Sequence, residues 1–474
     1  MAPSCPKTPR EPGFPEHVSG AREYRGIVTS TVRRAAAFAV VGLLSVTVPL
    51  AEGLEDPALA TVVAAGPYLL VALLALTVLS EGPLFELFAR PGDHRPRTLY
   101  GLAGFSLAAA GLAILAVEFG LPATVYVATV LLLSVGNLGG ELVRAVRNDP
   151  AIVTAGFVAA AFVGGTAGAV GTAQLLGGAV RPETVAFLAA AGGLLAALLR
   201  AVLFQRDDPL VLVAVALLLW VFTSLPLSVS ATRVAVALGV TVVLGYLSYA
   251  LETASLPGML TGVLLGLLTI VLGDYAWFAM LIAFFGIGGL SSKFRYDEKR
   301  DRGIAEANEG ARGTGNVLAN SLAALAALLA GAASPNLGLP RALFLFAFAG
   351  AVAAALADTL SSEIGGLYDR PRLITSFEVV DPGEDGAVTW QGTVAGVVGA
   401  AIVAGIGGGL VETIGPTGAA AIAVAGVGGM FVDSLLGATL EGRLVGNQGV
   451  NFLATATAGI VGGLLAVNLG LVAL

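Results

Sequence analysis

Long apolar stretches recur along almost the whole chain, and they constrain its fold more than any other feature. Each spans roughly 20 residues, the length that an α-helix needs to cross the hydrocarbon core of a bilayer. Short polar segments separate them, as expected for loops at the two membrane surfaces. The stretches, about fifteen in all, lie near residues 34–51, 58–79, 100–118, 122–140, 151–175, 183–203, 210–226, 231–250, 257–273, 275–292, 314–333, 340–360, 391–411, 416–440 and 448–472.

The composition leads to the same fold class. Charged residues make up 12% of the 474 residues, whereas a soluble domain carries about a quarter. A chain with so few charges cannot cover its own surface in water, so lipid must solvate much of it. The 64 glycines fit this conclusion, because small residues allow helices to approach closely in lipid. The sequence therefore predicts an all-α, polytopic transmembrane helical bundle in the cell membrane.

Three regions are expected along the chain. Residues 1–32 form a polar, proline-containing tail, which we expect to be disordered and which lacks the pattern of a cleavable signal peptide. The tail holds the single cysteine, Cys5, so an internal disulfide is excluded. Residues 33–230 form an N-terminal transmembrane bundle whose role the sequence does not indicate. Residues 231–474 form a second transmembrane domain with the longest polar loops.

The basic residues predict the orientation of the bundle. If the N-terminus is cytoplasmic and the spans alternate, every Lys and Arg except Arg181, Arg233 and Arg341 falls on the cytoplasmic side. Cytoplasmic loops carry an excess of these two residue types. We therefore expect the N-terminus and the two long polar loops, residues 291–313 and 358–390, to be cytoplasmic.

Two distant segments of the chain have similar sequences. Gly136–Glu141 followed by Pro150–Thr154 matches Asp358–Glu363 followed by Pro371–Thr375. Internal duplication is common in membrane folds, but small residues also recur by chance in a composition this biased. Both explanations stay open. If the repeat is real, it is degenerate, since the first copy has lost the aspartate.

The loop at residues 291–313 is rich in basic side chains and is predicted to be partly helical. Such a segment can contact phosphate groups, or it can serve only to fix the topology. Its candidate phosphate-binding residues are Lys293, Lys299, Arg302 and Arg312.

A group of acidic and hydroxyl residues stands at the end of the apolar stretch 340–360. Asp358 and Ser362 share one helix face, because they are four residues apart, and Glu363 follows directly. Phosphoryl transfer uses carboxylate and hydroxyl oxygens to hold Mg²⁺ against a nucleotide. We therefore predict that Asp358 and Glu363 are catalytic and bind Mg²⁺. Helix capping and solvation are the alternative.

The polar segment that follows offers further contacts for phosphates. It contains Arg372, Thr375, Gly383 and Gly386, which suit a mobile phosphate-binding loop. The chain lacks the Gly-x4-Gly-Lys-Ser/Thr signature of a phosphate loop. A purely connecting role is the alternative.

Asp433 is the strongest candidate on physical grounds. It lies well inside an apolar helix, where a carboxylate is costly unless a cation, a metal or a cavity accommodates it. We predict that Asp433 is catalytic, as a second metal ligand or by orienting the acceptor phosphate. Further polar residues predicted on helix faces of this half are Asn320, Ser434, Thr439, Asn447 and Asn451.

Several of these motifs together resemble domain-of-unknown-function family 92, which includes transmembrane protein 19-like proteins and a plant phytyl-phosphate kinase. The matching segments, within residues 235–474, are Leu318–Asn320, Asp358–Gly365, Pro371–Thr375, Pro382–Gly386 and Asp433–Thr439. The sequence departs from the family pattern at Asn316, Ser321 and Ala357, where Gln, Gly and Gly are expected. The acidic positions are kept.

The resemblance implies a membrane kinase that transfers a phosphoryl group from CTP, or another nucleoside triphosphate, to a polyprenyl monophosphate. CTP is then the co-substrate, Mg²⁺ the metal, and a prenyl phosphate in the bilayer the acceptor. No nucleic-acid partner is expected. A secondary transporter with a carboxylate at the membrane midplane is the competing hypothesis, and a non-catalytic membrane protein is a third.

Overall fold

The computed structural model describes residues 18–203, 208–227, 229–251, 254–305 and 314–474. Within this part of the chain, thirteen helices are long and apolar enough to cross a membrane, and two shorter apolar helices cover Asp208–Ser224 and Val317–Ala332. These helices occupy the positions of the predicted apolar stretches. The prediction of a polytopic helical bundle is confirmed. Residues 1–17 of the predicted tail lie outside the described residues, whereas residues 18–32 belong to a helix that covers Val18–Gly42.

The N-terminal half consists of helices joined by short connections. They are α1 (Val18–Gly42), the 3-10 turn η1 (Leu43–Val46), α2 (Thr47–Ala51), α3 (Pro57–Thr77), α4 (Pro83–Phe88), α5 (Tyr100–Phe119), α6 (Ala123–Arg144), α7 (Pro150–Leu175), α8 (Pro182–Val202) and α9 (Asp208–Ser224). Two of these helices, α3 and α7, begin with a capping aspartate that is followed by proline in the first turn. At α7, the Asp149 carboxylate accepts from the amides of Ala151 (2.9 Å) and Ile152 (3.0 Å).

The second half adds a small hairpin to its helices. Its elements are α10 (Ala231–Ala250), α11 (Leu256–Leu268), the π-helical turn η3 (Thr269–Gly273), α12 (Tyr275–Lys293), α13 (Tyr296–Asp301), α14 (Thr314–Ala332), α15 (Ser334–Leu337), α16 (Arg341–Gly365), β1 (Arg372–Leu373), β2 (Ala387–Val388), α17 (Trp390–Leu410), α18 (Gly415–Leu440) and α19 (Asn447–Asn468). Because α16 continues to Gly365, the expectation that a loop begins at residue 358 is wrong. Its last polar residues keep their helical hydrogen bonds and turn their side chains into a pocket.

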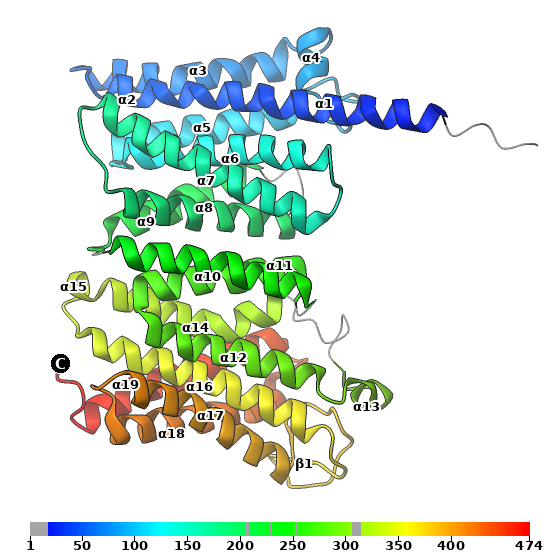
Figure 1. Ribbon diagram of the computed structural model, residues 1–474, viewed down its shortest axis with the longest axis vertical. Helices are drawn as coiled ribbons and strands as arrows, with labels where there is room; N and C mark the ends of the chain where they lie inside the picture. Colours follow the sequence, from blue (N-terminus) through cyan, green and yellow to red (C-terminus); the bar gives the residue numbers. More distant parts are fainter. Residues whose placement is uncertain (1–17, 204–207, 228, 252–253, 306–313) are drawn as a thin grey trace, which may run out of the picture.

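The helices run roughly parallel to one another, and the two halves are stacked along the long axis of the molecule (Figure 1). The start of α1, helix α13 and the β1 hairpin lie on one side of this stack. Helix α15 and the C-terminus lie on the opposite side. This arrangement agrees with the predicted alternation of spans, in which the N-terminus and both long polar loops share one membrane surface.

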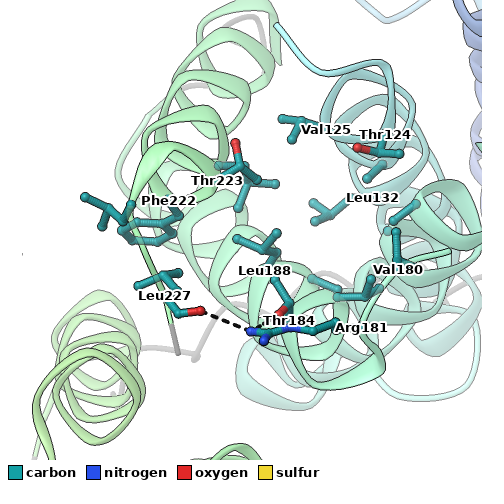
Figure 2. A pocket seen from close by; sticks show the side chains of 17 residues that line it. Thr124, Val125, Leu132, Val180, Arg181, Thr184, Leu188, Phe222, Thr223 and Leu227 are labelled. Atoms are coloured by element: carbon teal, nitrogen blue, oxygen red, sulfur yellow. Dashed lines mark hydrogen bonds between the residues drawn. The ribbon is translucent and has the colours of Figure 1, made fainter. Parts of the chain in front are cut away.

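Two of the three arginines on the other surface bind free backbone carbonyls. The Arg341 guanidinium donates to the carbonyls of Leu272 (2.8 Å) and Gly273 (2.7 Å), where the π-helical turn ends. Arg181 donates to the carbonyl of Leu227 at 3.0 Å, beside an apolar pocket of about 290 Å³ between α6, α7, α8 and α9 (Figure 2). These hydrogen bonds satisfy carbonyls at the ends of helices and in a connection, which gives two exceptions to the charge rule a structural role.

Helix α16 is the central element of the second half. It contacts α12, α14, α17, α18 and α19, and every residue from Phe348 to Ala357 is buried. Glycines on its neighbours allow this close approach. A Cβ added at Gly429 of α18 would lie 2.6 Å from the Cβ of Ala354, and one added at Gly396 of α17 would lie 2.8 Å from the carbonyl of Ala357. Such spacing leaves no room for a larger residue.

Two adjacent glycines of α18 test this packing. Gly429→Ala should lower the melting temperature in detergent, because the new methyl group must push α16 and α19 away, at about 1–3 kcal/mol. Gly428→Ala is the matched control, since a Cβ there meets no atom within 4 Å. Both changes carry the same gain in helix propensity. Equal melting temperatures for the two variants would contradict the close packing.

The sidedness of the loops stays a prediction and is tested with introduced cysteines in a Cys5→Ser background. Asp297→Cys, at an exposed position of α13, should resist a membrane-impermeant thiol reagent in intact cells. Asn336→Cys, exposed in α15 at the opposite end, should react. The reverse pattern, with both variants expressed normally, would invert the topology.

Candidate functional site

A polar pocket of about 300 Å³ lies in the second half, on the side of α13 and the β1 hairpin. We call it the acidic pocket. It is formed by the ends of α16 and α18, the start of α19, the loop between α16 and α17, and residues near α13. Its polar lining residues are Lys299, Asp358, Ser361, Ser362, Glu363, Glu384, Asp385, Thr389, Asp433, Ser434, Glu441 and Asn447.

Two facing carboxylates stand in this pocket, one from each of two long helices. Asp358 lies about two turns before the end of α16, and Asp433 about two turns before the end of α18. Their carboxyl groups are close enough to interact directly. Both side chains are half-buried. The structure thus brings together the two residues predicted to bind metal, although 75 positions separate them in the sequence.

A buried ion pair closes one side of the pocket. The ammonium of Lys299 lies 2.5 Å from the Glu363 carboxylate and donates to the carbonyl of Ser291 at 2.7 Å. The Lys299 side chain is 1% exposed and that of Glu363 is 11% exposed. The pair therefore fastens the segment after α12 to the end of α16. Lys299 is predicted to bind phosphate and Glu363 to bind metal, but in this structure the two side chains bind each other.

Glycines let the loop between α16 and α17 lie directly on α18. Gly386 has a φ of +78°, which disfavours any residue with a side chain. A Cβ there would also lie 2.6 Å from the carbonyl of Ser434. The antiparallel pairing of β1 with β2 holds this loop in place. Gly383 (φ +91°) and Gly386 both line the pocket, and their backbone conformation shapes it.

The described lining of the pocket is mainly acidic. Among the described lining residues, six are carboxylates and one is basic; the carboxylates are Asp358, Glu363, Glu384, Asp385, Asp433 and Glu441. Burial, and then the nearby Asp385 carboxylate, raise the pKa of Glu441. Neighbouring carboxylates repel one another, and a divalent cation between them relieves this repulsion.

The donor set fits Mg²⁺ in the form that accompanies a nucleotide. Carboxylate, hydroxyl and amide oxygens are hard ligands that suit this ion. No group of three His, Cys, Asp or Glu residues in the described part of the chain is placed to hold a metal. Mg²⁺ is commonly bound by one or two carboxylates, with water and substrate phosphates completing its shell. Asp358 and Asp433 match that arrangement.

Most of the predicted phosphate-binding cations lie elsewhere. Arg302 pairs with Asp369 (2.9 Å) outside the pocket lining. Arg372 donates to the carbonyl of Phe377 at 2.7 Å. Lys293 donates to the carbonyl of Leu251 and lines a separate apolar groove.

Lys293, Arg302 and Arg372 therefore do not line the acidic pocket, and their predicted contacts with phosphate stay a prediction. Thr375 is exposed in the β1 hairpin, and Arg312 lies outside the described residues.

The polar helix faces divide between the pocket and the helix interior. Ser362, Ser434 and Asn447 line the pocket. Asn451, one turn along α19, donates to the side-chain oxygen of Asn447 at 3.2 Å and so supports it. Asn320 is buried in α14 and Thr439 is exposed on α18; neither lines the pocket.

Some of the lining residues are not among the predicted site residues. They lie within or beside the predicted segments and are Ser361, Glu384, Asp385, Thr389 and Glu441. Their signal was the unusual density of acidic residues next to apolar helices. That signal does not say which side chains turn inward, because a loop's conformation is set by its tertiary contacts.

A double-mutant cycle tests the buried ion pair. Lys299→Met should destabilise the protein by about 3–5 kcal/mol, because it leaves the Glu363 charge buried without a partner. Lys299→Met combined with Glu363→Gln should recover most of this loss. Arg302→Met, which breaks an ion pair whose Asp369 side chain is 81% exposed, should cost less than about 1 kcal/mol. A Lys299→Met variant as stable as Arg302→Met in thermal unfolding would refute the structural role.

Comparison with known proteins identifies relatives of this half of the chain. The family model for integral membrane protein DUF92 matches residues 239–459. An uncharacterized membrane protein of Methanocaldococcus jannaschii is 34% identical over 220 residues, which cover 44% of this chain and 84% of that protein. The chloroplastic protein VTE6 of Arabidopsis thaliana is 30% identical over 190 residues, 40% of this chain and 57% of that protein.

A further relative, protein PGR of Arabidopsis thaliana, is 30% identical over 234 residues, 44% of this chain and 79% of that protein. No solved structure matches the chain. All residues that line the acidic pocket fall within the matched region. On these matches, the chain belongs to the DUF92 family of integral membrane proteins.

Proposed function

We propose that this protein is an integral membrane kinase that transfers a phosphoryl group from CTP, or another nucleoside triphosphate, to a polyprenyl monophosphate. The observation that carries the proposal is the facing pair Asp358 and Asp433 in a polar pocket at the end of apolar helices. A pocket at this position can bind a soluble nucleotide from the aqueous side and the phosphate of a lipid from the membrane side. The acidic lining favours a substrate that arrives with a divalent cation.

The relatives support the same class of reaction. The family that the motifs resemble includes a plant phytyl-phosphate kinase, and the chain shares 30% identity with the plant chloroplastic protein VTE6 over 190 residues. The aligned stretch covers 57% of VTE6, so the activity of the whole relative comes to this chain only as part of the proposal.

In the proposed reaction the bond between the γ-phosphorus and its bridging oxygen breaks, and a bond from an oxygen of the lipid phosphate to that phosphorus forms. The products are a nucleoside diphosphate and a prenyl diphosphate. The acceptor is already an anion, so the reaction depends on positioning and charge neutralisation more than on a general base. Mg²⁺, when bound, would neutralise charge on the transferred group. Asp358 and Asp433 would hold it, with Ser361, Ser362 and Asn447 beside them.

An apolar groove in the same half suits the hydrocarbon tail of the acceptor. It has a volume of about 350 Å³, lies between α10, α11 and α12, and has Lys293 among its lining residues. Leu251 and Lys293, at the ends of their helices, are joined by a hydrogen bond of 3.2 Å. A prenyl chain lying in this groove would keep its phosphate at the level of the membrane surface.

The transporter hypothesis receives less support from the position of Asp433. A coupling carboxylate is expected near the bilayer midplane. Asp433 lies in the last third of α18, about 10 Å from the end of the helix at the rise of an α-helix. That depth favours chemistry at the membrane surface.

The kinase assay uses the full-length protein in detergent with labelled CTP or ATP and a panel of prenyl monophosphates. We expect labelled prenyl diphosphate that requires Mg²⁺. Asp358→Asn and Asp433→Asn should lower turnover about a hundredfold or more, because the amide keeps the shape but removes the charge that the metal needs. Asp369→Asn, which changes an 81% exposed carboxylate outside the pocket, is the matched control.

Stability separates a catalytic role for Asp433 from a structural one. Without nucleotide and metal, Asp433→Asn should melt at the same temperature as the parent or higher, because it removes repulsion from Asp358. A clearly lower melting temperature would assign Asp433 to a structural charge pair. Failure of every nucleotide and acceptor to give product would count against the kinase proposal itself.

A further inference from the structure

A second polar cavity lies in the N-terminal half, and all its lining residues except Leu256 fall outside the family match. It has a volume of about 310 Å³ and is formed by the end of α6, the connection to α7, the start of α7 and the end of α8. Its polar lining residues are Asn137, Glu141, Arg144, Asn148, Thr154 and Arg200. We call it the arginine cavity.

The arginine cavity and the acidic pocket share part of their plan. In each, a long helix ends in a glutamate-containing turn, a connecting loop follows, and the end of the second helix after it contributes to the wall. The start of α7 also lines the arginine cavity, whereas the acidic pocket is completed by Lys299 of α13 and by the start of α19. The elements are α6, α7 and α8 in one half and α16, α17 and α18 in the other. The segments with similar sequences, which end at Glu141 and Glu363, occupy corresponding places. This correspondence favours a true internal repeat over chance.

The charge of the two sites is opposite. Where α18 presents Asp433 to the acidic pocket, α8 presents Arg200 to the arginine cavity. The Asp208 carboxylate, 9% exposed, is shared between Arg200 (2.9 Å) and Arg90 (2.5 Å). The Arg144 guanidinium pairs with Glu141.

The guanidinium groups of Arg90, Arg144 and Arg200 face the carboxylates of Glu141 and Asp208. The charges of the adjacent Arg34 and Asp93 cancel each other. The cluster therefore keeps an excess positive charge. The Arg200 guanidinium also lies 5.3 Å from the ring centre of Phe157, which orients it in the wall of the cavity.

Two polar atoms in the cavity wall lack a partner. The side-chain oxygens Asn137 Oδ1 and Glu141 Oε2 are buried and accept no hydrogen bond from the described protein atoms. Buried acceptors of this kind are normally satisfied by a ligand or by ordered water. They lie on consecutive turns of α6 and both line the cavity. A ligand with a hydroxyl group, or with bound water, would satisfy them.

We propose that the arginine cavity binds a phosphate group, carried by a phospholipid headgroup or free in solution. The phosphate oxygens accept hydrogen bonds from Arg144 and Arg200, and Asn137 and Glu141 accept from a hydroxyl of the ligand or from its water. Guanidinium groups suit phosphate because their planar set of donors matches two oxygens at once. The cavity lies at the end of the spans, where headgroups lie, and Val153, Phe157 and Leu256 supply apolar contacts beside the polar wall.

Equilibrium binding to the purified full-length protein in detergent tests this site. The probes are radiolabelled dioctanoyl phosphatidic acid and radiolabelled inorganic phosphate, with dioctanoylglycerol, which lacks the phosphate, as a competitor that should fail to displace either. A chelator keeps divalent cations absent, so that the acidic pocket, with its excess of carboxylates, does not hold phosphate. We expect saturable binding that Arg144→Gln and Arg200→Gln weaken at least tenfold, because each removes a charged donor.

Two further variants keep the test decisive. Arg147→Gln, at an exposed position just beyond α6 and outside the cavity lining, should bind like the parent. Asn137→Leu removes an unpartnered acceptor, so it should weaken binding several-fold without lowering the melting temperature of the unliganded protein.

Binding of phosphatidic acid alone would identify a lipid headgroup site, and binding of both probes would identify a site for the phosphate group itself. The proposal is overturned if neither probe saturates, or if Arg144→Gln and Asn137→Leu bind like the parent. The kinase assay is independent of this result, because its residues all lie in the other half.

Discussion

The close packing of α16 against its neighbours is the constraint on which the rest of the second half depends. Lipid gives helices no hydrophobic reason to associate, so dispersion contacts between close-fitting surfaces must hold them together. Gly396 on α17 and Gly429 on α18 bring the three backbones near enough for these contacts. The same approach sets the distance between Asp358 and Asp433. The geometry of the candidate site is therefore a consequence of small residues that take no part in its chemistry.

This packing also explains why an acidic pocket can exist at the end of apolar helices. Two carboxylates beside an apolar bundle repel each other and lose hydration. The bundle is rigid enough to hold them together, and Gly386 lets the loop above them lie directly on α18. The Lys299–Glu363 pair fixes the opposite wall. The pocket thus retains an uncompensated negative charge, which suits a substrate that brings its own cation.

The two halves of the chain carry polar cavities of opposite charge at the ends of long helices. In the second half, α16 and α18 present aspartates to a polar pocket; in the first, α6 and α8 present a glutamate and arginines to a cavity of similar size. The charges that line a site decide which ligands it can hold, and a few side chains at helix ends can set them without altering how the helices pack. The family match covers residues 239–459, which include the acidic pocket.

The sequence by itself determined the membrane-spanning helical fold and the approximate position of its spans, and it drew attention to Asp358 and Asp433, which the structure brings together. These follow from local properties: a run of apolar residues defines a span wherever it occurs, and a carboxylate within such a run is costly in any context. The tertiary structure alone decided which side chains meet. Asp358 interacts with Asp433, and Lys299 forms an ion pair with Glu363. Arg302 and Arg372 do not line the pocket. The physical reason is that contacts between side chains depend on how helices far apart in the sequence pack and on how a loop lies against them. No local sequence pattern determines the distances between such side chains.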